Sequence, residues 1–347
     1  MKKTFKRHKD YGFFDQDLRL SKLTKLGDPL EKLNKGIDFE IFRLILEDKL
    51  SILAKGAGGR PPYDYVLMFK VLILQRYYNL SDEQIEYQIN DRFSFMRFLN
   101  LTIADDIPDS RTVWKFKEQL VDLKLIETIF NIFLKQIENL GMILNEGKII
   151  DASFIEVPKQ RNTKEENKQI KEGEIPKSIT ENPNKKAQKD IDARWTQKGG
   201  INYFGYKNHV KVDSKSKIIT KYIVTTANVH DSQPLEQILT EQDKGQPLYA
   251  DSAYSGEPCN EIIVKKEVEN KTHIKGYKNK PLTADDFEQN RQKSSTRARV
   301  EHVFGFMEGS MNTMKLKQIG INRIEAAIGM MNLVYNMFRK IQLQAIL

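Results

Sequence analysis

The sequence predicts a protein of mixed α and β structure, in which a helical N-terminal part precedes a mixed five-stranded sheet flanked by helices. Two observations support this class. Apolar residues recur at helical intervals through the first 140 residues. After Gly141 the pattern changes to short runs that alternate between apolar and polar residues, interleaved with helix-like stretches. At 347 residues the chain is long enough for two or three folding units.

The N-terminal part divides into a charged, irregular arm at residues 1–36 and a helical domain at residues 37–140. The helical domain begins with a helix from Ile37 to Leu53, which ends at a basic, glycine-rich turn in residues 55–62. A strongly apolar helix follows at about Tyr63–Tyr78.

Further along, capping residues mark where helices begin. Ser81 with Gln84 three residues later matches a capping box. Asp109 or Ser110 is expected to cap a long helix that continues to about Leu140.

Short helices joined by tight turns and carrying cationic side chains are typical of a helix-turn-helix DNA reader. The cationic residues singled out as DNA contacts are Arg92, Arg97, Arg111 and Lys115. The alternative is a plain helical bundle whose arginines are solvated. The pattern does not indicate which helix would enter a groove.

Residues 145–347 are predicted to form the second unit. The expected elements, in order, are strands at Lys148–Val157, Tyr206–Asp213 and Ile218–Thr226, a helix near Pro234–Leu239, a strand at Leu248–Asp251, a helix at about Gly256–Val268, a weak strand near Thr272–Ile274, and helices at Glu301–Met314 and Arg323–Leu343. Residues 158–198, rich in Lys, Glu, Asn and Gln, are interpreted as a mobile charged insertion, and residues 275–293 as a basic loop. Three antiparallel strands followed by βα units form the layout of a ribonuclease H-like domain.

Three carboxylates stand at junctions of this layout. Asp151 and Asp251 each follow an apolar, strand-like run, and Glu301 opens a helix-like run. Mg²⁺ prefers oxygen ligands of this kind, and a pair of such ions can cleave and rejoin a phosphodiester. We therefore expect the three carboxylates to meet and to bind two Mg²⁺ ions.

Glu301 alone is weak evidence for a site. It lies at the edge of an apolar helical stripe, with Arg297 one turn before it. A surface Arg–Glu pair would give the same pattern. Only the combination with two aspartates at strand ends favours the catalytic interpretation.

Composition agrees with a nucleic-acid partner without proving one. The net charge is +9, and 30% of the residues are charged. A single cysteine, Cys259, rules out an internal disulfide and fits a reducing compartment. We find no signal peptide and no apolar run long enough to span a bilayer. A cytoplasmic, nucleoid-associated protein with no membrane partner is expected.

Five motifs in order carry a resemblance to a known family. They are Ile150–Ser153, Gly205–His209, Ala227–Ser232, Ala250–Tyr254 with Asp251, and Arg297-x-x-x-Glu301-His-Val-Phe-Gly. With these motifs the chain resembles the DDE transposases of bacterial insertion sequences, in the branch with a short spacer between the second aspartate and the glutamate. The resemblance covers residues from about 62 to 340.

The resemblance implies an activity and its partners. Such a protein binds the terminal inverted repeats of its element, cleaves at the ends, and joins the 3′-hydroxyl to target DNA. Asp151, Asp251 and Glu301 would hold two Mg²⁺ ions, with Mn²⁺ as a substitute. Arg297, Lys207 and His209 would steady phosphates of double-stranded DNA, and two protomers would pair the ends, although His209 alone is equally read as a structural histidine.

Two positions depart from the signature of related members. Ser294 and Glu308 stand where a tyrosine and a lysine usually contact terminal phosphates. Lys315, Tyr254 and Lys293 are weak candidates to replace them. The departures leave two rival interpretations open, a transposase-derived DNA-binding regulator without catalysis and a stand-alone nuclease.

Overall fold

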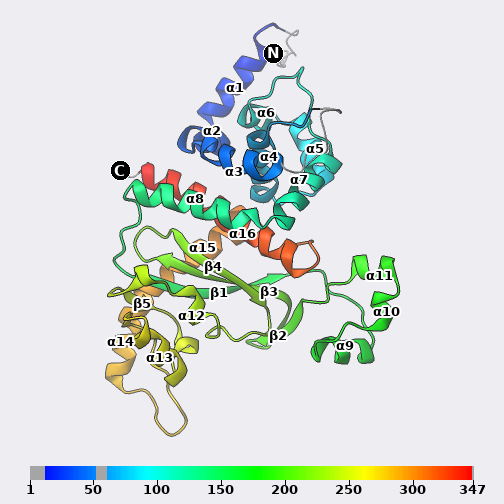
Figure 1. The fold of residues 1–347 in the computed structure, drawn as a ribbon. Helices are drawn as coiled ribbons and strands as arrows, with labels where there is room; N and C mark the ends of the chain where they lie inside the picture. The colour runs from blue at the N-terminus through cyan, green and yellow to red at the C-terminus, as the bar shows by residue number, and fades with distance from the viewer. Residues whose placement is uncertain (1–11, 52–60, 346–347) are drawn as a thin grey trace, which may run out of the picture.

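The computed structural model describes residues 12–51 and 61–345 (Figure 1). The N-terminal helices form one layer, and a mixed sheet lies beyond helices α8 and α16, which run between the two (Figure 1). The first 11 residues of the expected arm and most of the expected glycine-rich turn lie outside the described residues.

The first half of the chain is helical, as predicted. Its helices are α1 (Asp15–Lys25), α2 (Pro29–Gly36), α3 (Arg43–Ser51), α4 (Tyr65–Tyr77), α5 (Asp82–Asp91), α6 (Phe93–Leu99), α7 (Ser110–Asp122) and α8 (Leu125–Asn139), with a 3₁₀ turn at Phe39–Phe42 before α3. The capping box of Ser81 and Gln84 is present, and Asp109 caps α7 by accepting from the backbone N–H of Thr112.

Two expectations for this half are wrong. The described part of the arm is not irregular, because α1 and α2 form there and Asp28 caps α2. The single long helix expected after Asp109 is two helices. Lys124, with φ of 51°, adopts a left-handed conformation that ends one helix and begins the next.

The sheet has the predicted mixed topology, but it has six strands where the sequence indicated five. The strands are β1 (Lys148–Glu156), β2 (Arg194–Lys198), β3 (Ile201–Asp213), β4 (Ile219–Thr226), β5 (Pro247–Tyr249) and β6 (Glu269–Asn270). β1 is central, antiparallel to β3 and parallel to β5, and β6 continues the parallel side. β4 pairs antiparallel with the same stretch of β3 as β1 does, so these two strands flank β3 on opposite edges.

The sixth strand, β2, comes from the charged insertion. That segment also forms three short helices, α9 (Lys164–Lys171), α10 (Lys177–Thr180) and α11 (Pro183–Gln188). Ile170 and Ile179 are buried beneath them, and a capping box formed by Thr163 and Glu166 begins α9. Polar composition therefore concealed regular structure. The mobility of the insertion stays a prediction.

The remaining helices are α12 (Leu235–Ile238), α13 (Glu257–Lys265), α14 (Ala284–Arg297), α15 (Glu301–Gly305) and α16 (Ile321–Gln344). The expected basic loop at residues 275–293 contains most of α14, a helix with no buried residue that an apolar stripe could reveal. The helix beginning at Glu301 is shorter than expected, because a π-helical turn follows it at Phe306–Ser310.

Helix α16 joins the two halves of the molecule. Every residue from Ala327 to Phe338 is buried. One face of α16 packs on α4 and α8, and another packs on β4. A single hydrophobic core therefore includes Phe133 of α8, Met331 of α16 and Val210 of β3. The boundary near residue 140 stays a prediction.

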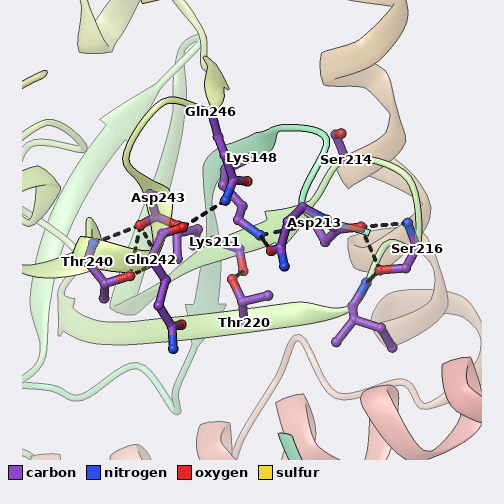
Figure 2. Close-up of polar contacts among 12 residues, drawn as sticks. Lys148, Lys211, Asp213, Ser214, Ser216, Thr220, Thr240, Gln242, Asp243 and Gln246 are labelled. Atoms are coloured by element: carbon purple, nitrogen blue, oxygen red, sulfur yellow. Dashed lines mark hydrogen bonds and ion pairs between the residues drawn. The ribbon is translucent and has the colours of Figure 1, made fainter. Parts of the chain in front are cut away.

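Charged side chains are also buried, at the edge of the sheet where β1 begins (Figure 2). Lys148 lies 3.5 Å from Asp213, which also accepts from the backbone N–H and hydroxyl of Ser216. Lys211 donates to Asp243 at 2.5 Å and to the hydroxyl of Thr240 at 2.9 Å. These two pairs leave each buried charge with an opposite partner.

Candidate active site

The sheet brings Asp151 and Asp251 to neighbouring positions. β1 and β5 are parallel, and the last residues paired between them are Ile149 and Tyr249. Each aspartate stands two residues beyond that pair, so both project from the same face at the same end of adjacent strands. Ile149 packs in the main core and Ile150 in the second core under α13, so Asp151 faces the α14–α15 side.

Burial without full charge compensation defines the environment of Asp151. Its side chain is 17% exposed. Burial raises the pKa of Asp151 to about 6, and the negative charge of Asp251 adds to this rise. A hydrogen bond from the N–H of Ala152 and the charge of Arg297 act in the opposite direction. The balance favours any added cation.

Arg297 connects Asp151 with Glu301. One guanidinium nitrogen lies 3.3 Å from the Asp151 carboxylate, and the other lies 3.5 Å from that of Glu301. The bend from α14 into α15 places Arg297 and Glu301 one turn apart. The side chain of Glu301 is 65% exposed, so the third carboxylate is near the pair but is held by an arginine rather than aimed at it.

Among the described residues, no group of three His, Cys, Asp or Glu side chains is already arranged around a metal position. The chemistry of the donors nevertheless fits Mg²⁺, because carboxylate oxygens are hard ligands. The pKa of Asp151 shows that at least one of them is short of positive charge.

Tyr254 is a residue of this site that the sequence did not reveal as such. It is 1% exposed, and its hydroxyl has no hydrogen-bond partner in the described structure. Burial raises the pKa of its phenol, and the charges of Asp151, Asp231 and Asp251 raise it further. Its position immediately after the motif carrying Asp251 was the available signal.

Lys207 and His209 lie on the opposite face of the sheet from Asp151. In the register of β1 and β3, Val210 stands opposite Asp151, and side chains alternate along β3. Lys207 donates to Asp231 at 2.7 Å and to the carbonyl of Val229. His209 is 1% exposed and shares a hydrogen bond with Thr225. Burial lowers its pKa to about 4, so the ring is neutral at pH 7.

The Gly205–His209 motif thus has an evident structural role. At Gly205, φ is 149° and a Cβ would lie 2.2 Å from the carbonyl oxygen of Ile155, so only glycine fits. Tyr206 donates to Asp190 in the insertion, and Asn208 exchanges amide hydrogen bonds with Asn332 of α16. The phosphate contacts expected from Lys207 and His209 stay predictions.

The four DNA contacts expected in the helical part differ in availability. Arg97 donates to Asp28 and Thr24, which ties α6 to the first two helices. Arg92 is exposed but lies over the rings of Tyr78 and Phe95.

Arg111 and Lys115 are both exposed on α7, one turn apart. Trp114, also on α7, is 51% exposed. The exposed face of α7 is the part of the helical region that presents cations and an aromatic ring together.

The candidates to replace the phosphate-contacting tyrosine and lysine are committed elsewhere. Tyr254 is buried, Lys293 donates to the carbonyl of Thr272, and Lys315 lies 3.8 Å from Glu156. Ser294 donates to the carbonyl of Asn290, and Glu308 is exposed on the π-helical turn.

No helix in the described part of the chain is long and apolar enough to cross a membrane. The sheet order and the paired aspartates define a ribonuclease H-like catalytic core. Residues 144–337 match the family described as "Transposase DDE domain", and residues 18–119 match the "Transposase domain (DUF772)". Because the first match spans more than half of the chain, the protein belongs to the DDE transposase family and is a DNA transposase.

Two solved structures show limited likeness to the chain. One is a piggyBac transposase synaptic complex with hairpin DNA, at 12% identity and a TM-score of 0.45, covering 91% of this chain and 75% of that one. The other is a pre-cleavage Mos1 transpososome, at 9% identity and a TM-score of 0.18, covering 83% of this chain and 81% of that one. Scores this low carry no weight for the fold, which rests on the strand order.

Proposed function

We propose that this transposase binds the terminal inverted repeats of an insertion sequence, cleaves at the element ends, and joins the freed 3′-hydroxyl to target DNA. The observation that carries the proposal is the matched position of Asp151 and Asp251 beyond the last paired residues of two adjacent parallel strands. Arg297 links Glu301 to this pair.

Asp151, Asp251 and Glu301 would hold two divalent cations, Mg²⁺ or Mn²⁺. When bound, such ions activate a water or a 3′-hydroxyl and stabilise the leaving oxygen. The chain itself supplies a buried carboxylate whose ionisation is unfavourable without a cation. Arg297, 22% exposed between two carboxylates, is placed to contact a phosphate beside them.

Double-stranded DNA is the proposed partner on two surfaces. The exposed cations of α7, Arg111 and Lys115, are proposed to contact the element end, and the Arg297 side of the sheet the scissile phosphate. Pairing of two ends would require two protomers, so we propose a homodimer on DNA.

One assay separates this proposal from its rivals. Labelled duplex carrying the element end is incubated with a target plasmid and Mg²⁺ or Mn²⁺, and products are resolved on a gel. Joined products support a transposase, whereas cut but unjoined DNA indicates a nuclease. Bound, uncut DNA indicates a regulator.

The same assay tests the three carboxylates one by one. We expect Asp151→Asn, Asp251→Asn and Glu301→Gln to abolish cleavage, a loss of at least about 10³-fold, while end binding persists. Asp285→Asn, an exposed change on α14, is the matched control and should cleave normally. Normal cleavage by any of the three variants would remove that residue from the mechanism.

A further inference from the structure

The hairpin formed by β2 and β3 presents a lysine that the sequence motifs did not single out. Its strands pair from Arg194 opposite Gly205 to Lys198 opposite Ile201. The turn is Gly199–Gly200, with φ of 58° and 80°. Two positive φ values at a two-residue turn fit the tight hairpin type that glycines allow. Lys198 is the last strand residue before this turn and is exposed.

The hairpin bends back toward β1. Phe154 stands opposite Lys207 in the register, yet its ring stacks on that of Tyr203, with centroids 4.3 Å apart and planes at 9°. In a straight strand Tyr203 would lie about 13 Å from Lys207. β3 therefore bends between them, and Gly205, with φ of 149°, lies in that interval.

The bend brings Lys198 to the catalytic end of β1. Its ammonium lies 5.8 Å from the centroid of the Phe154 ring, and Phe154 is three residues from Asp151 on the same strand. Burial dominates the pKa of Asp151, but the positive charge of Lys198 lowers that pKa. The two charges therefore sense each other across the site.

Lys198 differs from the other cations near these carboxylates. Lys207, which also lies over the Phe154 ring, is paired with Asp231. Arg297 is shared between Asp151 and Glu301. Within the described part of the chain, Lys198 has no carboxylate at ion-pair distance, and its contact with the ring holds it near the site without neutralising it.

We propose that Lys198 binds a phosphate of the DNA strand next to the scissile bond, with the stacked rings of Phe154 and Tyr203 as its support. This inference rests on the proposed function. It gives a place for a phosphate-contacting cation in a chain that has Glu308 on its π-helical turn and whose Lys293 and Lys315 are engaged with Thr272 and Glu156.

The first test measures how end binding depends on salt. A fluorescein-labelled duplex of the terminal inverted repeat is titrated with wild type, Lys198→Ala, Lys198→Glu and Lys198→Arg in EDTA between 50 and 200 mM NaCl. Loss of one phosphate contact lowers the slope of log K against log salt by about 0.9. We expect this for Lys198→Ala, a larger fall in affinity for Lys198→Glu, and near wild-type binding for Lys198→Arg. Lys186→Ala, an exposed lysine on α11, is the matched control and should keep the wild-type slope.

The second test locates the phosphate. Duplexes carry one neutral methylphosphonate at or beside the scissile position. The neutral linkage should weaken wild-type binding about as much as Lys198→Ala does, and combining the two should add nothing further. A full additional loss in the combination, or an unchanged salt slope in Lys198→Ala, overturns the inference.

Failure of the inference is distinguishable from failure of the proposed function. If Asp151→Asn abolishes cleavage while Lys198→Ala and Lys198→Glu bind and cleave as wild type does, only the role of Lys198 is lost. If Asp151→Asn cleaves normally, the proposed function fails as well. Circular dichroism melting of each variant checks folding, and a change at this exposed turn should leave the melting temperature within about 2 °C of wild type.

Discussion

The two ends of β1 treat buried charge in opposite ways. At its start, Lys148 faces Asp213, and on the neighbouring strand Lys211 faces Asp243, so each buried charge has an opposite partner (Figure 2). Further along β1, Asp151 is buried near Asp251, and its cationic contact is an arginine shared with Glu301. One end is neutralised within the chain, whereas the other has excess negative charge.

This difference separates structural from functional burial. A buried ion pair costs desolvation and regains it from its partner. Two buried carboxylates with a shared arginine do not regain that cost, which is why the pKa of Asp151 is raised. A site that binds cations must carry this deficit before the cation arrives, and the paired end of the sheet provides the rigid support.

The largest effect is expected at the neutralised end. Asp243→Asn leaves Lys211 buried without its counter-charge and should lower the free energy of unfolding by about 3–5 kcal/mol. Urea unfolding followed by circular dichroism measures this. The double variant Lys211→Met with Asp243→Leu should recover most of the loss. A cost below about 1 kcal/mol for Asp243→Asn would contradict the contrast between the two ends.

The opposite sign is expected at the catalytic end. The folded pKa of Asp151 is about 6 against a reference value of 3.8, so the folded state binds this proton more tightly than the unfolded state. Stability from this group is complete below pH 3.8 and is lost as pH rises through about 6.

The corresponding free energy is about 3 kcal/mol at neutral pH. Asp151→Asn should therefore raise the free energy of unfolding of metal-free protein at pH 8 by up to this amount, with little gain at pH 3.5. Denaturant melts in EDTA at the two pH values test the sign. Destabilisation at pH 8 would show that Asp151 is adequately compensated.

A smaller effect is expected from the cation itself. Mg²⁺ at ten times its dissociation constant should raise the free energy of unfolding of the wild type by about 1.4 kcal/mol. Asp151→Asn should lose this gain, while Asp285→Asn should keep it. Thermal melts at increasing MgCl₂, with NaCl adjusted to constant ionic strength, provide the measurement. An equal gain in both variants would assign the effect to general screening.

Much of this contrast could be predicted from the sequence, for a physical reason. Asp151 and Asp251 each end a short apolar run, and a polar residue at the end of a buried strand is visible without coordinates. The order of strands and helices then brings the two together. The partner of Glu301 was also predictable, because Arg297 is one helical turn away.

Other features depend on tertiary contacts that leave little local signal. β2 lies in a charged segment, and its pairing with β3 depends on the bend near Gly205. α14 is polar all round, so only its capping box, Thr283 with Asp286, could have indicated it. The burial of Lys207 follows from Asp231, which is 24 positions away along the chain.

The buried position of α16 constrains how the molecule is made. This helix follows the other elements along the chain, yet it covers apolar surface of α4, α8 and β4. On the ribosome, the earlier helices must wait with those surfaces uncovered until α16 emerges. We expect translation products that stop before residue 321 to aggregate or be degraded, so a shortened copy would be a poor competitor for the DNA that the complete chain binds.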